Sequence, residues 1–140
     1  MIDQETGYYA VPSSVKAVVY AAEGSGTAVL LGLNDRGEWE LPGGWPDSQD
    51  ESLAETLSRE VLEETGIVIE NDCVLVGAEL FSPVPGRQVT LICFATRLDA
   101  AKAPVSSLEH KDVRWVEVAS LPTNLPAIYR RFIEASVSAV

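Results

Sequence analysis

Apolar and β-branched residues open the hydrophobic pattern of the chain in two runs, residues 15–22 and residues 27–33. Between them lies Glu23-Gly24-Ser25-Gly26, and glycines suit tight turns, so the pattern predicts a β-hairpin. A third, shorter strand is predicted at residues 39–41. A Pro-Gly-Gly sequence then interrupts the apolar pattern, and residues 42–51 are therefore expected to form a loop.

Helix signals bracket the next segment of the chain. Ser52 and Glu55 have the spacing of a capping box, in which a serine side chain accepts a free backbone N–H at the start of a helix. The residues that follow are good helix formers, and Gly66 stands where a left-handed residue commonly ends a helix. These signals predict a helix over residues 52–65.

The rest of the chain alternates strand-like runs with turns and ends in a second helix. Residues 82–86 contain two prolines and a glycine and are expected to form a turn, and residues 127–137 read as the closing helix. Strands are predicted at residues 67–69, 74–80, 88–97 and 113–118. Strands mixed with two helices indicate an α/β fold in which helices pack on a sheet. Without a repeat or a long linker, residues 1–140 are expected to form one domain.

Composition narrows the class of protein. With 140 residues, of which 46% are hydrophobic, the chain is large enough to fold without a disulfide or a structural metal, so Cys73 and Cys93 are interpreted as reduced core thiols. It has neither a signal-peptide pattern nor an apolar run of about 20 residues, which predicts a cytoplasmic protein without a membrane partner. The net charge of -11 disfavours a nucleic acid polymer as partner. A small phosphorylated substrate then requires cations to bridge it to the carboxylates.

Three glutamates crowd one side of the predicted helix. At about 100° per residue, Glu60, Glu63 and Glu64 fall within an arc of roughly 100°. On a helical wheel, Glu60 and Glu64 border the apolar stripe that contains Leu57 and Val61, so their side chains are expected to be partly shielded from water. Their position near the carboxyl end of the helix adds an unfavourable dipole interaction and mutual repulsion, both of which a bound cation would remove.

A purely structural interpretation of this helix stays open on geometry alone. Glutamate is a good helix former, and Arg59 lies four residues from both Glu55 and Glu63, so ion pairs on a solvated helix would explain part of the pattern. Exposed glutamates also often tolerate such penalties. By helix geometry, the functional and the structural interpretations are about equally supported.

Gly44, Glu51 and Arg59-Glu60-Val61-Leu62-Glu63-Glu64-Thr65-Gly66-Ile67 resemble the Nudix box, which has a glycine, an acid, and then Arg-Glu-apolar-any-Glu-Glu-any-Gly-apolar. The resemblance implies a Nudix-type α/β/α sandwich with a mixed sheet and a catalytic loop-helix-loop, as a single hydrolase domain over residues 1–140. One feature departs from the pattern: six residues instead of five separate Gly44 from Glu51. Asp50 would restore that first spacing but lengthen the second, so Glu51 is preferred.

The resemblance also implies the chemistry, which is metal-dependent hydrolysis of a diphosphate bond in a nucleoside diphosphate derivative. Glu60 and Glu64 are expected to bind Mg²⁺ or Mn²⁺ directly, with Glu63 as a further ligand or a contact to metal-bound water. Arg59 would orient Glu60, and the Gly44 carbonyl would reach the metal. The general base would be a box glutamate or an acid of a later loop, for which Glu109 is the candidate.

Several other side chains are weaker candidates for substrate contacts. Planar rings can stack on a base and guanidinium groups can bind phosphate, although aromatic residues are more often core and arginines more often free. The candidates are Trp45, Phe81, Tyr8 and Tyr9 among the aromatic residues, and Arg36, Arg87 and Arg97 among the arginines. His110 is the sole histidine, has no partners for a triad or a zinc site, and is expected at the surface.

Two further classes of function compete with the hydrolase. A catalytically silent Nudix-like module would bind a nucleotide as a regulatory signal, but the complete Arg-Glu-Glu-Glu set favours an enzyme. A plain interaction domain with an acidic helix would need no divalent metal and would tolerate replacement of Glu60 and Glu64. A homodimer is a possible assembly.

Overall fold

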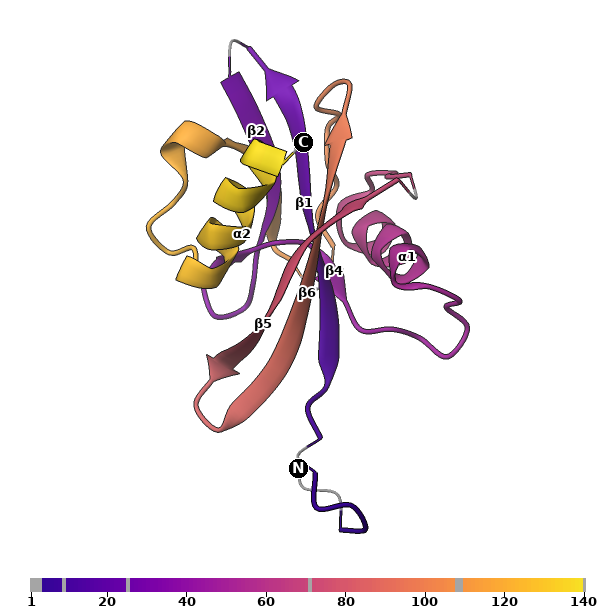
Figure 1. Ribbon diagram of the computed structural model, residues 1–140. Coiled ribbons are helices and arrows are strands. Elements are labelled where there is room, and N and C mark those ends of the chain that lie inside the picture. Colours follow the sequence, from indigo (N-terminus) through magenta and orange to yellow (C-terminus); the bar gives the residue numbers. More distant parts are fainter. Residues whose placement is uncertain (1–3, 9, 25, 71, 108–109, 140) are drawn as a thin grey trace.

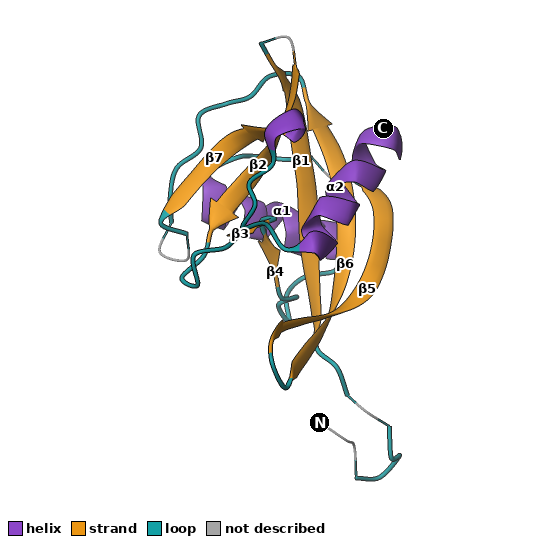
Figure 2. Cartoon of the chain, turned by 90° about the vertical axis from the view of Figure 1, so that its left-hand side faces the viewer, coloured by secondary structure: helices purple, strands orange, loops and turns teal. Residues whose placement is uncertain are grey.

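The computed structural model of the chain describes residues 4–8, 10–24, 26–70, 72–107 and 110–139. Two helices lie on opposite sides of a mixed sheet, so the α/β/α sandwich expected from the sequence is confirmed (Figure 1). Turning the molecule shows α2 in front of the sheet and α1 behind it (Figure 2). None of the helices in the described part of the chain has the length and apolar character needed to cross a lipid bilayer.

The described residues form a sheet of seven strands, with β3-β2-β1-β6-β5 as its main order. The strands are β1 (Ser13–Glu23), β2 (Gly26–Leu33), β3 (Trp39–Glu40), β4 (Gly43–Gly44), β5 (Val74–Val84), β6 (Arg87–Leu98) and β7 (Asp112–Glu117). The helices are α1 (Leu53–Thr65), the short 3-10 helix η1 (Val118–Ser120) and α2 (Ala127–Ala139).

Strand β1 is the centre of the sheet because it pairs with three other strands. It runs parallel to β6 over nine residue pairs, from Ser13 opposite Thr90 to Ala21 opposite Leu98. Its end forms the predicted antiparallel hairpin with β2, whereas its beginning pairs with β4, which places Val15 opposite Gly44. The glycine pair of the predicted loop is therefore part of the sheet.

Side chains that alternate along β1 belong to two separate hydrophobic cores, one on each face of the sheet. Val15, Ala17 and Val19 contact the side of α1, where Leu57 and Val61 are fully buried. On the other face, Val18 and Tyr20 belong to the core that α2 covers. Successive side chains of a strand point to opposite faces, and here both faces are covered, which explains the nearly continuous apolar run in the sequence.

Local signals set the ends of α1 as predicted. The Ser52 side chain accepts the Glu55 backbone N–H at 3.1 Å. At the other end, Gly66 has a φ of 73° and donates its N–H to Leu62 O at 2.9 Å. The glycine absorbs a left-handed conformation that most residues disfavour, so the chain can leave the helix at once.

Besides the loop that contains β4, two predicted elements differ from the structure. Residues 67–69 form no strand, although Ile67 and Ile69 are buried in the α1-side core. Their apolar character serves packing, and the Ile67 N–H is bound by Thr65 Oγ1 at 3.1 Å instead of by a neighbouring strand. The turn expected at residues 82–86 begins later, because β5 continues to Val84 before the chain reverses.

Candidate active site

The side chains of Glu60 and Glu64 both contact the short strand β4. Glu64 is buried, with 4% of its surface exposed, and its Oε2 accepts the Gly43 backbone N–H at 3.1 Å. Glu60 lies beside Gly44 so closely that a Cβ added to that glycine would be 2.5 Å from the Glu60 carboxyl carbon. The predicted shielding of these two acids is thus observed, and glycine is needed where Glu60 approaches the backbone.

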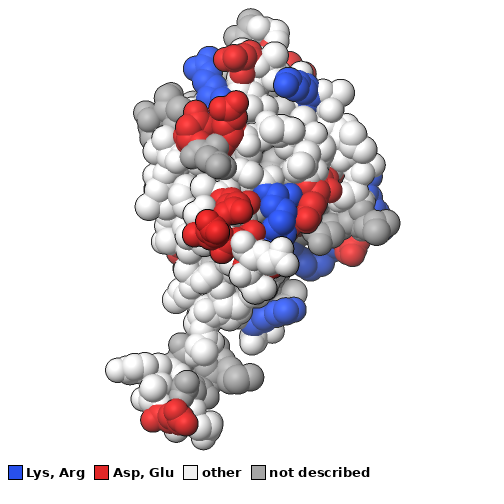
Figure 3. All heavy atoms as spheres, turned by 90° about the vertical axis from the view of Figure 1, so that its right-hand side faces the viewer, with Lys and Arg blue, Asp and Glu red and all other residues white. Residues whose placement is uncertain are grey.

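Glu63 differs from its two neighbours. Its side chain is 59% exposed, against 15% for Glu60, and it lies on the open side of α1. The Arg59 Nη1 is 3.6 Å from a Glu63 carboxylate oxygen, which is a loose and solvent-screened ion pair. On the face that carries α1, acidic side chains lie on both sides of basic ones (Figure 3). Of the three glutamates, Glu63 alone is freely reached by water.

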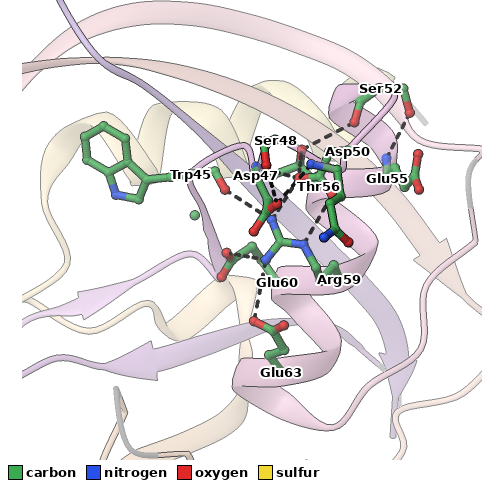
Figure 4. A network of polar contacts seen from close by, with 12 residues as sticks. Trp45, Asp47, Ser48, Asp50, Ser52, Glu55, Thr56, Arg59, Glu60 and Glu63 are labelled. Atoms are coloured by element: carbon green, nitrogen blue, oxygen red, sulfur yellow. Dashed lines mark hydrogen bonds and ion pairs between the residues drawn. The ribbon is translucent and has the colours of Figure 1, made fainter.

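Arg59 connects the helix to the preceding loop (Figure 4). Its Nη1 donates to Glu60 Oε1 at 2.9 Å, and its Nη2 donates to the Trp45 carbonyl at 3.2 Å. The same guanidinium binds Asp50 with two bonds, from Nη2 at 2.8 Å and from Nε at 3.3 Å. These hydrogen bonds raise the pKa of Arg59, led by the one to Asp50, and its planar fork holds the Glu60 carboxylate in one orientation.

Asp50 is the acid of the loop that meets Arg59. Its pKa lies well below the usual range, first because of the Arg59 hydrogen bonds and then because of the Asp47 backbone N–H and the Thr56 hydroxyl. Glu51, which the spacing argument favoured, is exposed, and its backbone N–H binds the Glu55 carboxylate at 3.0 Å. The sequence places both acids before the helix, and only the folded loop distinguishes them.

His110 is not at the surface, so that expectation is wrong. The ring is 2% exposed, and its Nε2 lies 2.7 Å from Glu40 Oε1. Its Nδ1 lies 3.9 Å from Glu64 Oε2. Strand β2 makes room for the ring at Gly32, where a Cβ would be 2.7 Å from the imidazole. His110 has no partner nearby in the sequence, but the fold places its ring next to the carboxylates of Glu40 and Glu64.

A pocket of about 120 Å³ opens beside β4. Its walls combine aromatic, apolar and charged side chains, namely Ser14, Lys16, Arg36, Glu40, Trp45, Phe81, Pro83, Val89, Leu91 and Tyr129. Trp45, Phe81 and Arg36 are among the candidates from the sequence, whereas Lys16 and Tyr129 are not. Lys16 is the charged residue within an apolar strand run, and that interruption was the available signal.

The remaining sequence candidates lie elsewhere. Tyr8 is 76% exposed, and Arg87 is exposed at the start of β6. Arg97 lines a different pocket together with the acidic Asp99. Tyr9 and Glu109 lie outside the described residues.

The donor set beside β4 consists of oxygen atoms, which are the ligands that a hard divalent cation prefers. No three His, Cys, Asp or Glu side chains converge on one point within the described part of the chain. Mg²⁺ is usually held by one or two carboxylates, waters and substrate phosphate oxygens, and it does not need a complete protein cage. Two shielded carboxylates that flank a glycine backbone fit that pattern.

Comparison with known proteins gives a consistent family assignment. The family model of the NUDIX domain matches residues 11–135. No curated protein matches the chain at a significant level.

Solved structures show the same fold. The NUDIX domain of Shewanella oneidensis NrtR complexed with ADP ribose has a TM-score of 0.81 at 22% identity, over 98% of this chain and 93% of that one. The same protein has been solved with a 27mer DNA, where the TM-score is 0.68 at 22% identity, over 91% of this chain and 61% of that one. The MutT protein from Methanosarcina mazei Go1 gives 0.74 at 29% identity, over 92% and 94% of the two chains. A C. elegans Ap4A hydrolase binary complex gives 0.76 at 18% identity, over 92% and 96%.

Proposed function

The chain belongs to the Nudix family, and from this we propose that it is a metal-dependent pyrophosphohydrolase that cuts a diphosphate bond in a nucleoside diphosphate derivative. The observation that carries the proposal is the placement of two shielded carboxylates, Glu60 and Glu64, against the Gly43–Gly44 backbone. Burying two carboxylates of like charge is costly, and a divalent cation offsets that cost.

Glu60, Glu64 and the Gly44 carbonyl would hold Mg²⁺ or Mn²⁺, with Glu63 as a further ligand or a contact to metal-bound water. Oxygen donors suit these ions. When bound, the metal would neutralise charge on the phosphates and lower the pKa of an attacking water. The exposure of Glu63 supports its assignment to a contact through water, because its carboxylate is already solvated.

Arg59 and Asp50 would fix the catalytic geometry without touching the substrate. Arg59 orients the Glu60 carboxylate through its Nη1, and Asp50 immobilises the guanidinium from the other side. A carboxylate that is already oriented needs no reorganisation during the reaction, which is the advantage of a preorganised site. The proton of the attacking water would pass to Glu109 or to one of the box glutamates.

The pocket beside β4 would take the group attached to the diphosphate. Trp45 directly follows Gly44, and the Phe81 and Tyr129 rings lie 5.7 Å apart in a tilted arrangement. Lys16 adds a cation with its Nζ 5.9 Å from the centre of the Tyr129 ring. Aromatic walls and a cation suit a nucleoside with further phosphate or ribose oxygens. The relatives that bind ADP ribose or hydrolyse Ap4A support this substrate class.

The test is a panel of nucleoside triphosphates, ADP-ribose, nucleotide sugars and dinucleoside polyphosphates, assayed with Mg²⁺ and Mn²⁺. We expect hydrolysis of at least one class. Glu60→Gln or Glu64→Gln should lower kcat/KM by about 100-fold or more, because charge stabilisation by a metal is worth several kcal/mol. Glu55→Gln, in the first turn of the same helix, is the matched control and should retain activity. Unchanged turnover in both site variants would refute the assignment.

The competing function is a silent nucleotide-binding module, and the NrtR domain that was solved with ADP ribose is the observation that favours it. That function requires ADP-ribose binding, measured by calorimetry, without turnover under any metal condition. A nucleic acid partner is disfavoured by the net charge of -11. Fluorescence anisotropy with duplex DNA tests that point, because one relative was solved with DNA.

A further inference from the structure

Lys16 is a charged residue within the apolar run of β1, and it lines the pocket beside β4. The residues on either side of it, Val15 and Ala17, belong to the core under α1, whereas the Lys16 side chain lies on the face that α2 covers. There its Nζ lies 5.9 Å from the centre of the Tyr129 ring, which is a wall of the same pocket. The residue is 9% exposed, so its ammonium group lies inside the molecule at this pocket.

Glu40 balances the charge of Lys16, but both of its oxygens have partners within the fold. Burial would raise its pKa, but the His110 hydrogen bond, the charge of Lys16 and a hydrogen bond from Asn34 lower it to about 2, so the carboxylate is ionised. Its Oε1 lies 2.7 Å from His110 Nε2, and its Oε2 accepts the Asn34 Nδ2 at 3.2 Å. Lys16, in contrast, brings three N–H donors to the pocket.

The aromatic walls indicate which part of a nucleotide would lie beside Lys16. Tyr129 and Phe81 form a tilted pair of rings with centres 5.7 Å apart, and aromatic rings pack well against a nucleobase. The phosphates would lie at Glu60 and Glu64, which contact β4 from α1. A nucleotide bound across β4 would thus place its base, and not its phosphates, next to the ammonium group.

We propose that Lys16 is a specificity-determining residue that selects nucleotides whose base carries a carbonyl oxygen where adenine and cytosine carry an amino group. The inference rests on the proposed function, because it requires that the pocket takes the nucleoside of the substrate. An ammonium group donates hydrogen bonds and accepts none, so it can bind O6 of guanine or hypoxanthine or O4 of uracil, but not an amino group. Lysine binds guanine O6 in the same way in protein–DNA complexes.

The alternative is that Lys16 contacts a phosphate or ribose oxygen, which every nucleotide offers. Inosine and adenosine nucleotides separate the two roles, because they share all phosphate and ribose groups. They differ at position 6 of the base and the adjoining nitrogen, where inosine has a carbonyl and adenosine an amino group. A contact to the base changes the ratio of the two affinities, whereas a contact to phosphate or ribose changes both affinities equally.

The experiment measures the dissociation constants of IMP and AMP by NMR titration without metal, and kcat/KM for ITP and ATP with Mg²⁺. We expect the wild type to favour IMP and ITP by about 10- to 100-fold, which is the discrimination that a good contact to a base edge gives. The ratio within one protein does not depend on the fraction that is folded, so the variants can be compared even where they lose stability.

Three substitutions test the role of the ammonium group. Lys16→Met keeps an unbranched side chain, removes the charge and should bring both ratios close to one. Lys16→Gln, whose amide can present a donor or an acceptor, should lower both ratios as well. Lys102→Met makes the same change at an exposed position outside the pocket and should keep the wild-type ratios.

Equal or tighter binding of AMP by the wild type would overturn the inference, and so would a Lys16→Met protein that loses affinity for both nucleotides at the wild-type ratio. A wild type that prefers IMP but hydrolyses no member of the substrate panel would overturn the proposed hydrolysis and leave the selection of the base in place. A protein that binds neither monophosphate would overturn the pocket as a nucleoside site, and this inference with it.

Discussion

Replacing Gly44 with alanine would test the active-site geometry with a single methyl group. The added Cβ would lie 2.5 Å from the Glu60 carboxyl carbon, whereas ordinary contact begins at 3.4 Å. Because Gly44 is paired with Val15 in the sheet, its backbone is held in place, and the Glu60 carboxylate has to move away by about 0.9 Å. Displacements of about 1 Å at a catalytic group can cost about 100-fold in rate, and we expect that loss in kcat/KM.

The fold should survive this change. Gly44 has no positive φ, and the neighbour that must move is the flexible end of a side chain, so we expect a stability loss of about 1 kcal/mol. Gly43→Ala should behave differently, because φ is 151° there and the Cβ would lie 1.9 Å from the Val15 carbonyl oxygen. Alanine is thus predicted to impair catalysis at position 44 and folding at position 43.

Initial rates on the best substrate of the panel and urea unfolding curves measure the two effects. Gly26→Ala is the control, because its added Cβ would have no neighbour nearer than 4.0 Å. Gly44→Ala with wild-type kcat/KM and wild-type metal dependence would refute the reasoning that Glu60 acts from its position against β4.

The remaining predictions concern stability and reactivity. Ser52→Ala should lower the free energy of unfolding in urea by about 1 kcal/mol, because the first turn of α1 loses its cap. Burial alone would raise the pKa of Glu40, but His110 and Lys16 lower it from 4.5 to about 2. The ionised carboxylate therefore stabilises the fold fully above about pH 4.5, and this stabilisation is lost as the pH falls through about 2. In urea titrations over that range, Glu40→Gln should show a smaller pH dependence than the wild type. Burial raises the pKa of Cys93 to about 12, so a thiol reagent at neutral pH should modify it only after unfolding.

The parts of the fold that could be predicted from the sequence are those with local causes. The cap at Ser52, the left-handed Gly66 and the helix between them depend on neighbouring residues, and the β1–β2 hairpin depends on its turn. The shielding of Glu60 and Glu64 followed from the helix period relative to the apolar stripe.

The parts that were missed depend on contacts between distant segments. Strand β4 exists because Gly43 and Gly44 pair with β1, which no local pattern of the loop indicates. His110 is buried because Glu40, 70 residues away, offers it a partner and Gly32 leaves it space. The choice of Asp50 over Glu51 likewise depends on where Arg59 reaches once the loop has folded.

The loop between β4 and α1 is anchored at both ends, and the residues between the two anchors are exposed. Gly44 is fixed by β1 and Asp50 by Arg59, whereas residues 45–49 are all exposed. Such a segment can change length without moving either anchor, because the added backbone bulges into solvent. This explains how the chain accommodates six residues between Gly44 and Glu51. An insertion at Pro46 would leave the hydrogen bond from the Asp47 N–H to Asp50 in place, so this position suits a reporter peptide.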